Sequence, residues 1–129
     1  MNYVIDTHTL LWYITSNEQL SKRVEHILDV SQEERTTVIV PSIVLVEAVD
    51  ILEKGKIEHQ IDVFIEILKN SGAYTLAFPE WDIIEKYREI NQNLDIHDRL
   101  IVATALKWDA RILTKDAEIL KYYGQFVVW

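Results

Sequence analysis

Short apolar runs alternate along the chain with longer segments in which apolar residues recur every three or four positions. The runs are rich in β-branched and aromatic residues, which favour strands, and turn-forming residues lie near several of their ends. We therefore predict buried strands at residues 2–5 (NYVI), 36–40 (TTVIV), 73–78 (AYTLAF), 111–114 (RILT) and 125–129 (QFVVW).

The longer segments have the spacing of helices that bury one face. Ser42 is the expected N-cap of a helix that ends before Gly55, and Pro79 stands where a later helix is expected to begin. Helical spacing also relates Leu10 to Leu11 and Ile14, and Leu20 to Val24, Ile27 and Leu28. The other helical segments are 43–55, 59–70, 79–91 and 94–106.

Strands that alternate with helices predict a parallel sheet covered on both faces. The expected fold class is therefore α/β, a three-layer α/β/α sandwich around a central, mostly parallel sheet of about five strands. The 129 residues are expected to form a single domain, 1–129, which suffices to bury about two-thirds of the unfolded surface.

The composition excludes several classes of protein. The chain has no cysteine, so neither a disulfide framework nor a thiolate metal site is possible. We expect a soluble cytoplasmic protein without a membrane partner, because neither a signal peptide nor a bilayer-spanning run is evident. The formal charge of −8 argues against a nucleic-acid partner, unless several acids are gathered in one place and neutralised by metal ions.

Four acidic residues occupy special positions in this pattern. Asp6 directly follows the first strand, and Asp116 follows the strand at 111–114. Asp98 lies at the start of the helix that leads into that strand, and Glu47 lies one turn into the helix after 36–40. Since ligands of open parallel sheets bind beyond the carboxyl ends of the strands, we expect all four acids at one edge of the sheet.

Glu47 is the only charged residue between Arg35 and Asp50, and its neighbours are apolar. An acid in such a segment is costly to bury without a cation, a hydrogen-bond donor or a metal ion. A salt bridge to Arg99 would also stabilise the Glu47 carboxylate. Alternatively, Glu47 is exposed to solvent.

Asp95 and Asp98 stand three residues apart at the start of LDIHDRLIVATAL. Asp95 suits the N-cap of this helix, where acids meet the positive end of the helix dipole. Asp98 then falls in the first turn, on the same face as Val102 and Ala105, where capping does not require a second carboxylate.

Four carboxylates in one pocket repel each other by about 4 kcal/mol for each close pair at an effective dielectric constant near 20. Mg²⁺ or Mn²⁺ offsets this repulsion, because these hard cations prefer oxygen ligands. Two such ions activate a water molecule and stabilise the leaving oxygen of a phosphodiester.

Other catalytic patterns are missing from the sequence. The four histidines form neither HExxH nor another zinc motif, and there is no Walker A loop, GxGxxG or GxSxG. His8 and His97 stand beside proposed ligands, where a supporting or surface role is favoured over proton transfer. The tryptophans and tyrosines fall mostly on helical or strand patterns, which favours core or dimer-interface roles over base stacking.

Four blocks of the sequence, YVIDTHTLLWY, PSIVLVEAVDILEKGKI, DIHDRLIVATAL and ILTKDAEI, resemble in order and spacing the signature blocks of PIN domains, and above all VapC-type toxins. The resemblance implies an endoribonuclease that depends on Mg²⁺ or Mn²⁺. Its catalytic and metal-binding acids would be Asp6, Glu47, Asp98 and Asp116. It also implies a homodimer and a small cognate antitoxin, whose basic segment an acidic pocket would attract.

Four further residues beside these acids are candidate contacts for the RNA substrate. Thr7 and Thr114 can hydrogen-bond carboxylate or phosphate, although a threonine next to a strand end is more often only a local cap. Arg99 and Lys115 can contact the RNA backbone, and a solvated surface charge explains them equally well.

Two other functions are compatible with the sequence. One is a non-catalytic PIN-like module that binds RNA or protein, and the other is a small acid-dependent phosphohydrolase. The presence of all four acids favours the nuclease.

Overall fold

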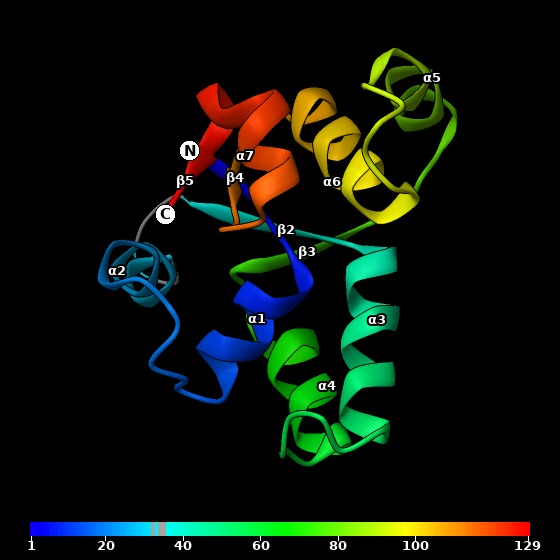
Figure 1. Ribbon diagram of the computed structural model, residues 1–129. Helices are drawn as coiled ribbons and strands as arrows, with labels where there is room; N and C mark the ends of the chain where they lie inside the picture. The colour runs from blue at the N-terminus through cyan, green and yellow to red at the C-terminus, as the bar shows by residue number, and fades with distance from the viewer. Residues whose placement is uncertain (32, 34–35) are drawn as a thin grey trace.

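The computed structural model describes residues 1–31, 33 and 36–129. In these residues a five-stranded sheet with the order β3-β2-β1-β4-β5 has helices on both faces, and every strand pair is parallel (Figure 1). The expected α/β fold class is thus confirmed. The strands are β1 (Asn2–Ile5), β2 (Thr37–Pro41), β3 (Tyr74–Ala77), β4 (Arg111–Leu113) and β5 (Val127–Val128). The helices are α1 (Thr7–Ile14), α2 (Lys22–Val30), α3 (Ser42–Glu53), α4 (Ile61–Asn70), α5 (Trp81–Glu89), α6 (Ile96–Lys107), α7 (Ala117–Tyr123) and a 3-10 turn η1 (Gly124–Phe126).

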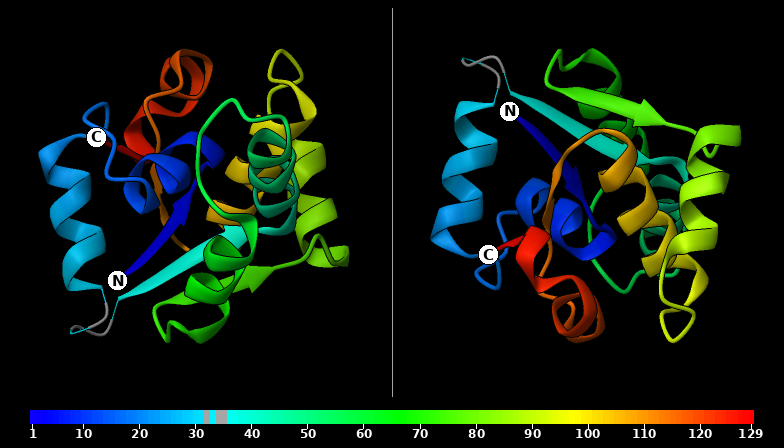
Figure 2. Two further views of the ribbon diagram at one scale, coloured as in Figure 1. Left: turned by 90° about the horizontal axis from the view of Figure 1, so that it is seen from below. Right: turned by 90° about the horizontal axis from the view of Figure 1, so that it is seen from above.

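The helices form two layers around the sheet. Helices α1, α3 and α4 lie on one side of the sheet, and α6 and α7 lie on the other (Figures 1 and 2). Helix α5 packs on α6 at the margin of the molecule (Figure 1). The central strands are therefore covered from both faces.

Burial on both faces explains why the central strands are continuous apolar runs. Val4 of β1 pairs with Ile39 of β2 on one side and with Ile112 of β4 on the other. These three side chains are fully buried, as are Ile5 and Leu113. The core therefore lies around β1, the middle strand of the sheet.

Three local predictions need correction. Ser42 does not cap α3, because the helix begins at Ser42 itself, directly after Pro41 ends β2, and has no side-chain cap. Helix α5 begins at Trp81 and not at Pro79, with extended Glu80 before it. Helix α7 was not predicted, because a seven-residue helix with one buried side chain, Ile119, gives no periodic pattern.

Gly55 ends α3 as predicted, with a φ of 68° that suits glycine. None of the helices in the described residues is both long enough and apolar enough to cross a membrane.

Phe64 of α4 is the largest of the fully buried side chains in the described residues and offers a test of the core. We expect Phe64→Ala to lower the free energy of unfolding by about 3–5 kcal/mol, because it removes buried contacts and leaves a cavity. Val63→Ala, at the exposed neighbouring position, should cost less than about 1 kcal/mol. Urea unfolding followed by circular dichroism measures both, and equal losses would contradict the packing described for α4.

Candidate functional site

A hollow with a volume of about 190 Å³ opens at the carboxyl ends of the strands. Five carboxylates surround it, together with two histidines, a threonine and one apolar side chain. The lining residues are Asp6, Thr7, His8, Glu47, Asp95, His97, Asp98, Ile101 and Asp116. The structure therefore brings the four predicted acids to one place.

Asp6 is positioned by the pairing of β1 with β4. Ile5 is paired with Leu113, so the next residues, Asp6 and Thr114, lie side by side. The buried Thr114 hydroxyl donates a hydrogen bond to Oδ2 of Asp6, and the Thr9 N–H donates to Oδ1 at 2.9 Å. Burial raises the pKa of Asp6, while the hydrogen bonds from Thr114 and Thr9 oppose this rise.

Asp116 is held by the helix that it starts. Its Oδ1 accepts hydrogen bonds from the N–H groups of Glu118 (3.0 Å) and Ile119 (2.9 Å), so Asp116 caps α7. The N–H of Asp116 donates to the Thr114 hydroxyl at 3.0 Å. Thr114 therefore links the two aspartates through one side chain.

Asp95 caps α6 as predicted, because its Oδ1 accepts the N–H of Asp98 at 2.9 Å. The sequence pattern assigned Asp95 to capping alone, yet it also lines the hollow. Asp98 lies in the first turn of α6, where the helix dipole favours a negative charge.

Glu47 of α3 is 35% exposed and not fully buried. Its carboxylate lies 3.6 Å from Nε2 of His97 on α6. The alternative salt bridge to Arg99 is not present, since no ion pair between these two described residues occurs. No sequence pattern predicts the contact with His97, because it joins two helices that are far apart in the chain.

The carboxyl group of Asp98 is strongly perturbed by its surroundings in this hollow. Burial, and after it the negative charges of Asp116, Asp95, Asp6 and Glu47, together raise its pKa to about 7. The hollow thus holds more negative charge than its own protein groups neutralise.

The four candidate substrate contacts lie in different settings. Thr7 lines the hollow, and Thr114 bonds Asp6. The guanidinium of Arg99 lies 3.9 Å from the ring centre of Tyr87 and donates to the Tyr87 carbonyl at 3.1 Å, so it points toward α5. The ammonium of Lys115 lies 4.8 Å from the ring centre of Trp12. The structure therefore does not bring Arg99 into the hollow.

The donor set of the hollow fits a divalent cation. Hard cations bind carboxylate oxygens, and the neighbouring carboxylates that help to raise the pKa of Asp98 would also favour a positive charge here. In the described part of the chain, no three such side chains already form a closed ligand cluster. The acids thus share a hollow without being drawn together around one point.

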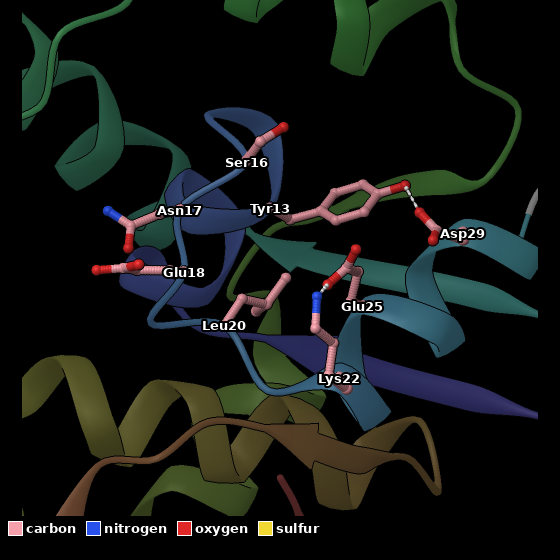
Figure 3. Close-up of a pocket in the computed structure, with 8 residues that line it drawn as sticks. All are labelled: Tyr13, Ser16, Asn17, Glu18, Leu20, Lys22, Glu25 and Asp29. Carbon is pink, nitrogen blue, oxygen red and sulfur yellow. Dashed lines mark hydrogen bonds and ion pairs between the residues drawn. The ribbon is translucent and has the colours of Figure 1, made fainter.

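A second hollow, of about 420 Å³, lies between α1 and α2 (Figure 3). Two side-chain contacts join residues that line it. The Tyr13 hydroxyl donates a hydrogen bond to Asp29 at 3.0 Å, and Lys22 forms an ion pair with Glu25 at 3.1 Å. It is lined by Tyr13, Ser16, Asn17, Glu18, Leu20, Lys22, Glu25 and Asp29. We place the candidate site in the smaller hollow, which lies at the carboxyl ends of the strands.

The fold and the hollow define a parallel α/β protein with an acid-lined site at its strand ends. Residues 3–125 match the family model of the PIN domain, and the chain belongs to this family. The fold is similar to the crystal structure of VapBC2 from Rickettsia felis bound to a DNA fragment from their promoter. That likeness has a TM-score of 0.75 at 16% identity and covers 99% of this chain and 98% of that chain. A comparison with curated proteins gave no match.

The raised pKa of Asp98 predicts a pH dependence of stability for the metal-free protein. The folded state keeps a proton on Asp98 that the unfolded chain releases, between the ordinary value of 3.8 and about 7. The contribution of Asp98 to stability therefore falls as the pH rises through this window. At pH 8, in the presence of a chelator, we expect Asp98→Asn to be more stable by about 1 kcal/mol after allowance for solvent screening.

Urea unfolding at several pH values measures this effect. Asp62→Asn, which changes an exposed carboxylate on α4, is the matched control and should leave the pH profile unchanged. A profile of Asp98→Asn that parallels the unmodified protein from pH 4 to pH 8 would contradict the electrostatics described here.

Proposed function

We propose that this protein is a metal-dependent endoribonuclease that acts as the toxin of a toxin–antitoxin pair. The observation that carries the proposal is the set of five carboxylates around one hollow, with the pKa of Asp98 raised to about 7. Carboxylates forced together in this way favour a divalent cation, and phosphodiester cleavage uses such cations. Membership of the PIN domain family supports the same assignment, since its members are typically nucleases.

Asp6, Glu47, Asp98 and Asp116 are the residues that we propose hold Mg²⁺ or Mn²⁺. The bound ion would supply an activated water molecule and stabilise the leaving oxygen. Thr9 and Thr114 fix the orientation of Asp6 by hydrogen bonds, and the α7 cap fixes that of Asp116. Asp98 keeps its place because α6 starts at Asp95.

Lys115 and Thr7 are the residues that we propose contact the RNA backbone. Lys115 is exposed, directly precedes Asp116, and makes no ion pair among the described residues. An exposed ammonium beside the acids suits a phosphate, which is the usual backbone contact. Arg99 is not proposed for this role, because Tyr87 holds its guanidinium.

The decisive experiment is incubation of total RNA with the protein and Mn²⁺, followed by mapping of new 5′ ends. We expect discrete cuts that fall by about 100-fold or more in Asp6→Asn, the scale of loss when one group that stabilises a transition-state charge is removed. Asp62→Asn is the control, because it removes an exposed carboxylate on α4. Cuts that persist equally in Asp6→Asn would mean a contaminating nuclease and would overturn the assignment.

Thermal unfolding separates the nuclease from a non-catalytic PIN-like module. If the acids bind the ion, Mn²⁺ at 100 times its dissociation constant stabilises the folded state by about 2.7 kcal/mol. Asp6→Asn should lose this stabilisation and Asp62→Asn should keep it. Stabilisation without RNA cleavage would leave a binding module, and cleavage of phosphomonoesters alone would favour a phosphohydrolase.

The proposed partner is a small antitoxin with a basic segment. The acid-lined hollow and the net charge of −8 favour a basic inhibitor over an acidic one. We expect expression of the chain to arrest bacterial growth, and co-expression of its small cognate protein to restore it. Asp98→Asn should not arrest growth, and arrest by this variant would show that toxicity does not come from the hollow.

A further inference from the structure

His97 is one of two histidines in the hollow for which the proposed function gives no role. It lies in the first turn of α6, and its Nε2 is 3.6 Å from Oε2 of Glu47 on α3. Helices α3 and α6 contact each other, although they are far apart in the chain (Figure 1). Within the described part of the chain, His97 makes no other hydrogen bond or ion pair. Its imidazole is thus committed to one of the proposed metal ligands.

The stability of the fold does not explain this pairing well. The side chains of His97 and Glu47 are 42% and 35% exposed, and ion pairs that are this accessible to water contribute little to stability. Lysine and arginine are charged throughout the physiological pH range and would be stronger partners for a carboxylate. Imidazole differs from both, because its neutral form has a lone pair that binds metal ions. A metal-binding role therefore accounts better for a histidine at this place.

The separation of the two atoms suits neighbouring ligands of one ion. Oxygen and nitrogen ligands lie about 2.1 Å from small divalent metal ions, so neighbouring ligands of one ion are about 3 Å apart. Small rotations of two partly exposed side chains close the difference between this value and the observed 3.6 Å. Both residues line the hollow, so His97 offers a nitrogen atom beside the carboxylates.

His8, the other histidine of the hollow, is placed differently. Its ring lies beside that of Trp12, with 5.7 Å between the ring centres. Among the described residues, His8 forms no ion pair with an acid. The contact with a proposed metal ligand is therefore specific to His97.

We propose that His97 supplies a nitrogen ligand to the ion held by Glu47, so that the hollow prefers a first-row transition ion to Mg²⁺. Mg²⁺ is bound through oxygen atoms, whereas imidazole binds transition ions, and the affinity of mixed nitrogen and oxygen sites rises from Mn²⁺ to Co²⁺. The acids alone offer only oxygen. His97 is thus the residue that determines which ion is bound. The inference rests on the proposed metal site and does not depend on RNA cleavage.

Titration calorimetry of the full chain with Co²⁺ and with Mg²⁺ tests the preference. We expect the unmodified protein to bind Co²⁺ more tightly. His97→Gln should raise the dissociation constant for Co²⁺ at least about 10-fold, the scale of loss when even a group behind a ligand is removed, and should change that for Mg²⁺ by less than about 3-fold. Glu47→Gln should weaken the binding of both ions, because it removes an oxygen ligand that both use. His26→Gln, at an exposed position on α2, is the control and should change neither constant.

Pulsed electron paramagnetic resonance of bound Mn²⁺ detects the ligand directly. The nitrogen nucleus of a coordinated imidazole modulates the electron spin echo. We expect this modulation in the unmodified protein and in His8→Gln, and its loss in His97→Gln, while circular dichroism shows that both variants are folded. Modulation that persists in His97→Gln, or equal losses of Co²⁺ and Mg²⁺ affinity in that variant, would overturn the inference and leave the metal site in place. Failure of every ion to bind would overturn the proposed function as well.

Discussion

Repulsion between carboxylates at one edge of the sheet is the constraint on which the site depends. Parallel strands end on the same side, and this chain places acids after β1, after β4, at the start of α6 and one turn into α3. The repulsion between these carboxylates contributes to the raised pKa of Asp98. Serine or asparagine would cap these helices without a charge and would therefore avoid the repulsion between carboxylates. The retained charge is therefore the strongest sign of a function beyond folding.

The strand order explains why the acids meet where they do. The chain builds β2 and β3 outward on one side of β1 and then β4 and β5 on the other, so the order reverses between β1 and β4. Crevices at such reversals are the usual binding places of open α/β sheets. Here Asp6 and Thr114 extend the paired strands by one residue each, and their hydrogen bond orients Asp6, which lines the hollow.

Much of the fold can be predicted from the sequence, because the spacing of apolar residues follows directly from which side chains are buried. The strands, most of the helices and the Asp95 cap follow from apolar spacing and capping chemistry. Contacts between helices cannot be predicted in this way. The packing of Arg99 on Tyr87 depends on how α6 lies against α5, and the approach of His97 to Glu47 depends on how α6 lies against α3. No local pattern encodes such distances. The contact of Arg99 with Tyr87 therefore has no signal in the sequence, and α7 is too short to give a periodic pattern.

Three aspartates that line the hollow, Asp6, Asp95 and Asp116, each also cap a helix. The same carboxylates thus anchor backbone N–H groups near the start of α1, α6 and α7 and face the space where a cation would enter. Occupation of that space would consequently reduce backbone motion at three points far apart in the chain. The first turns of three helices that lie far apart in the chain thus meet at one space through these carboxylates.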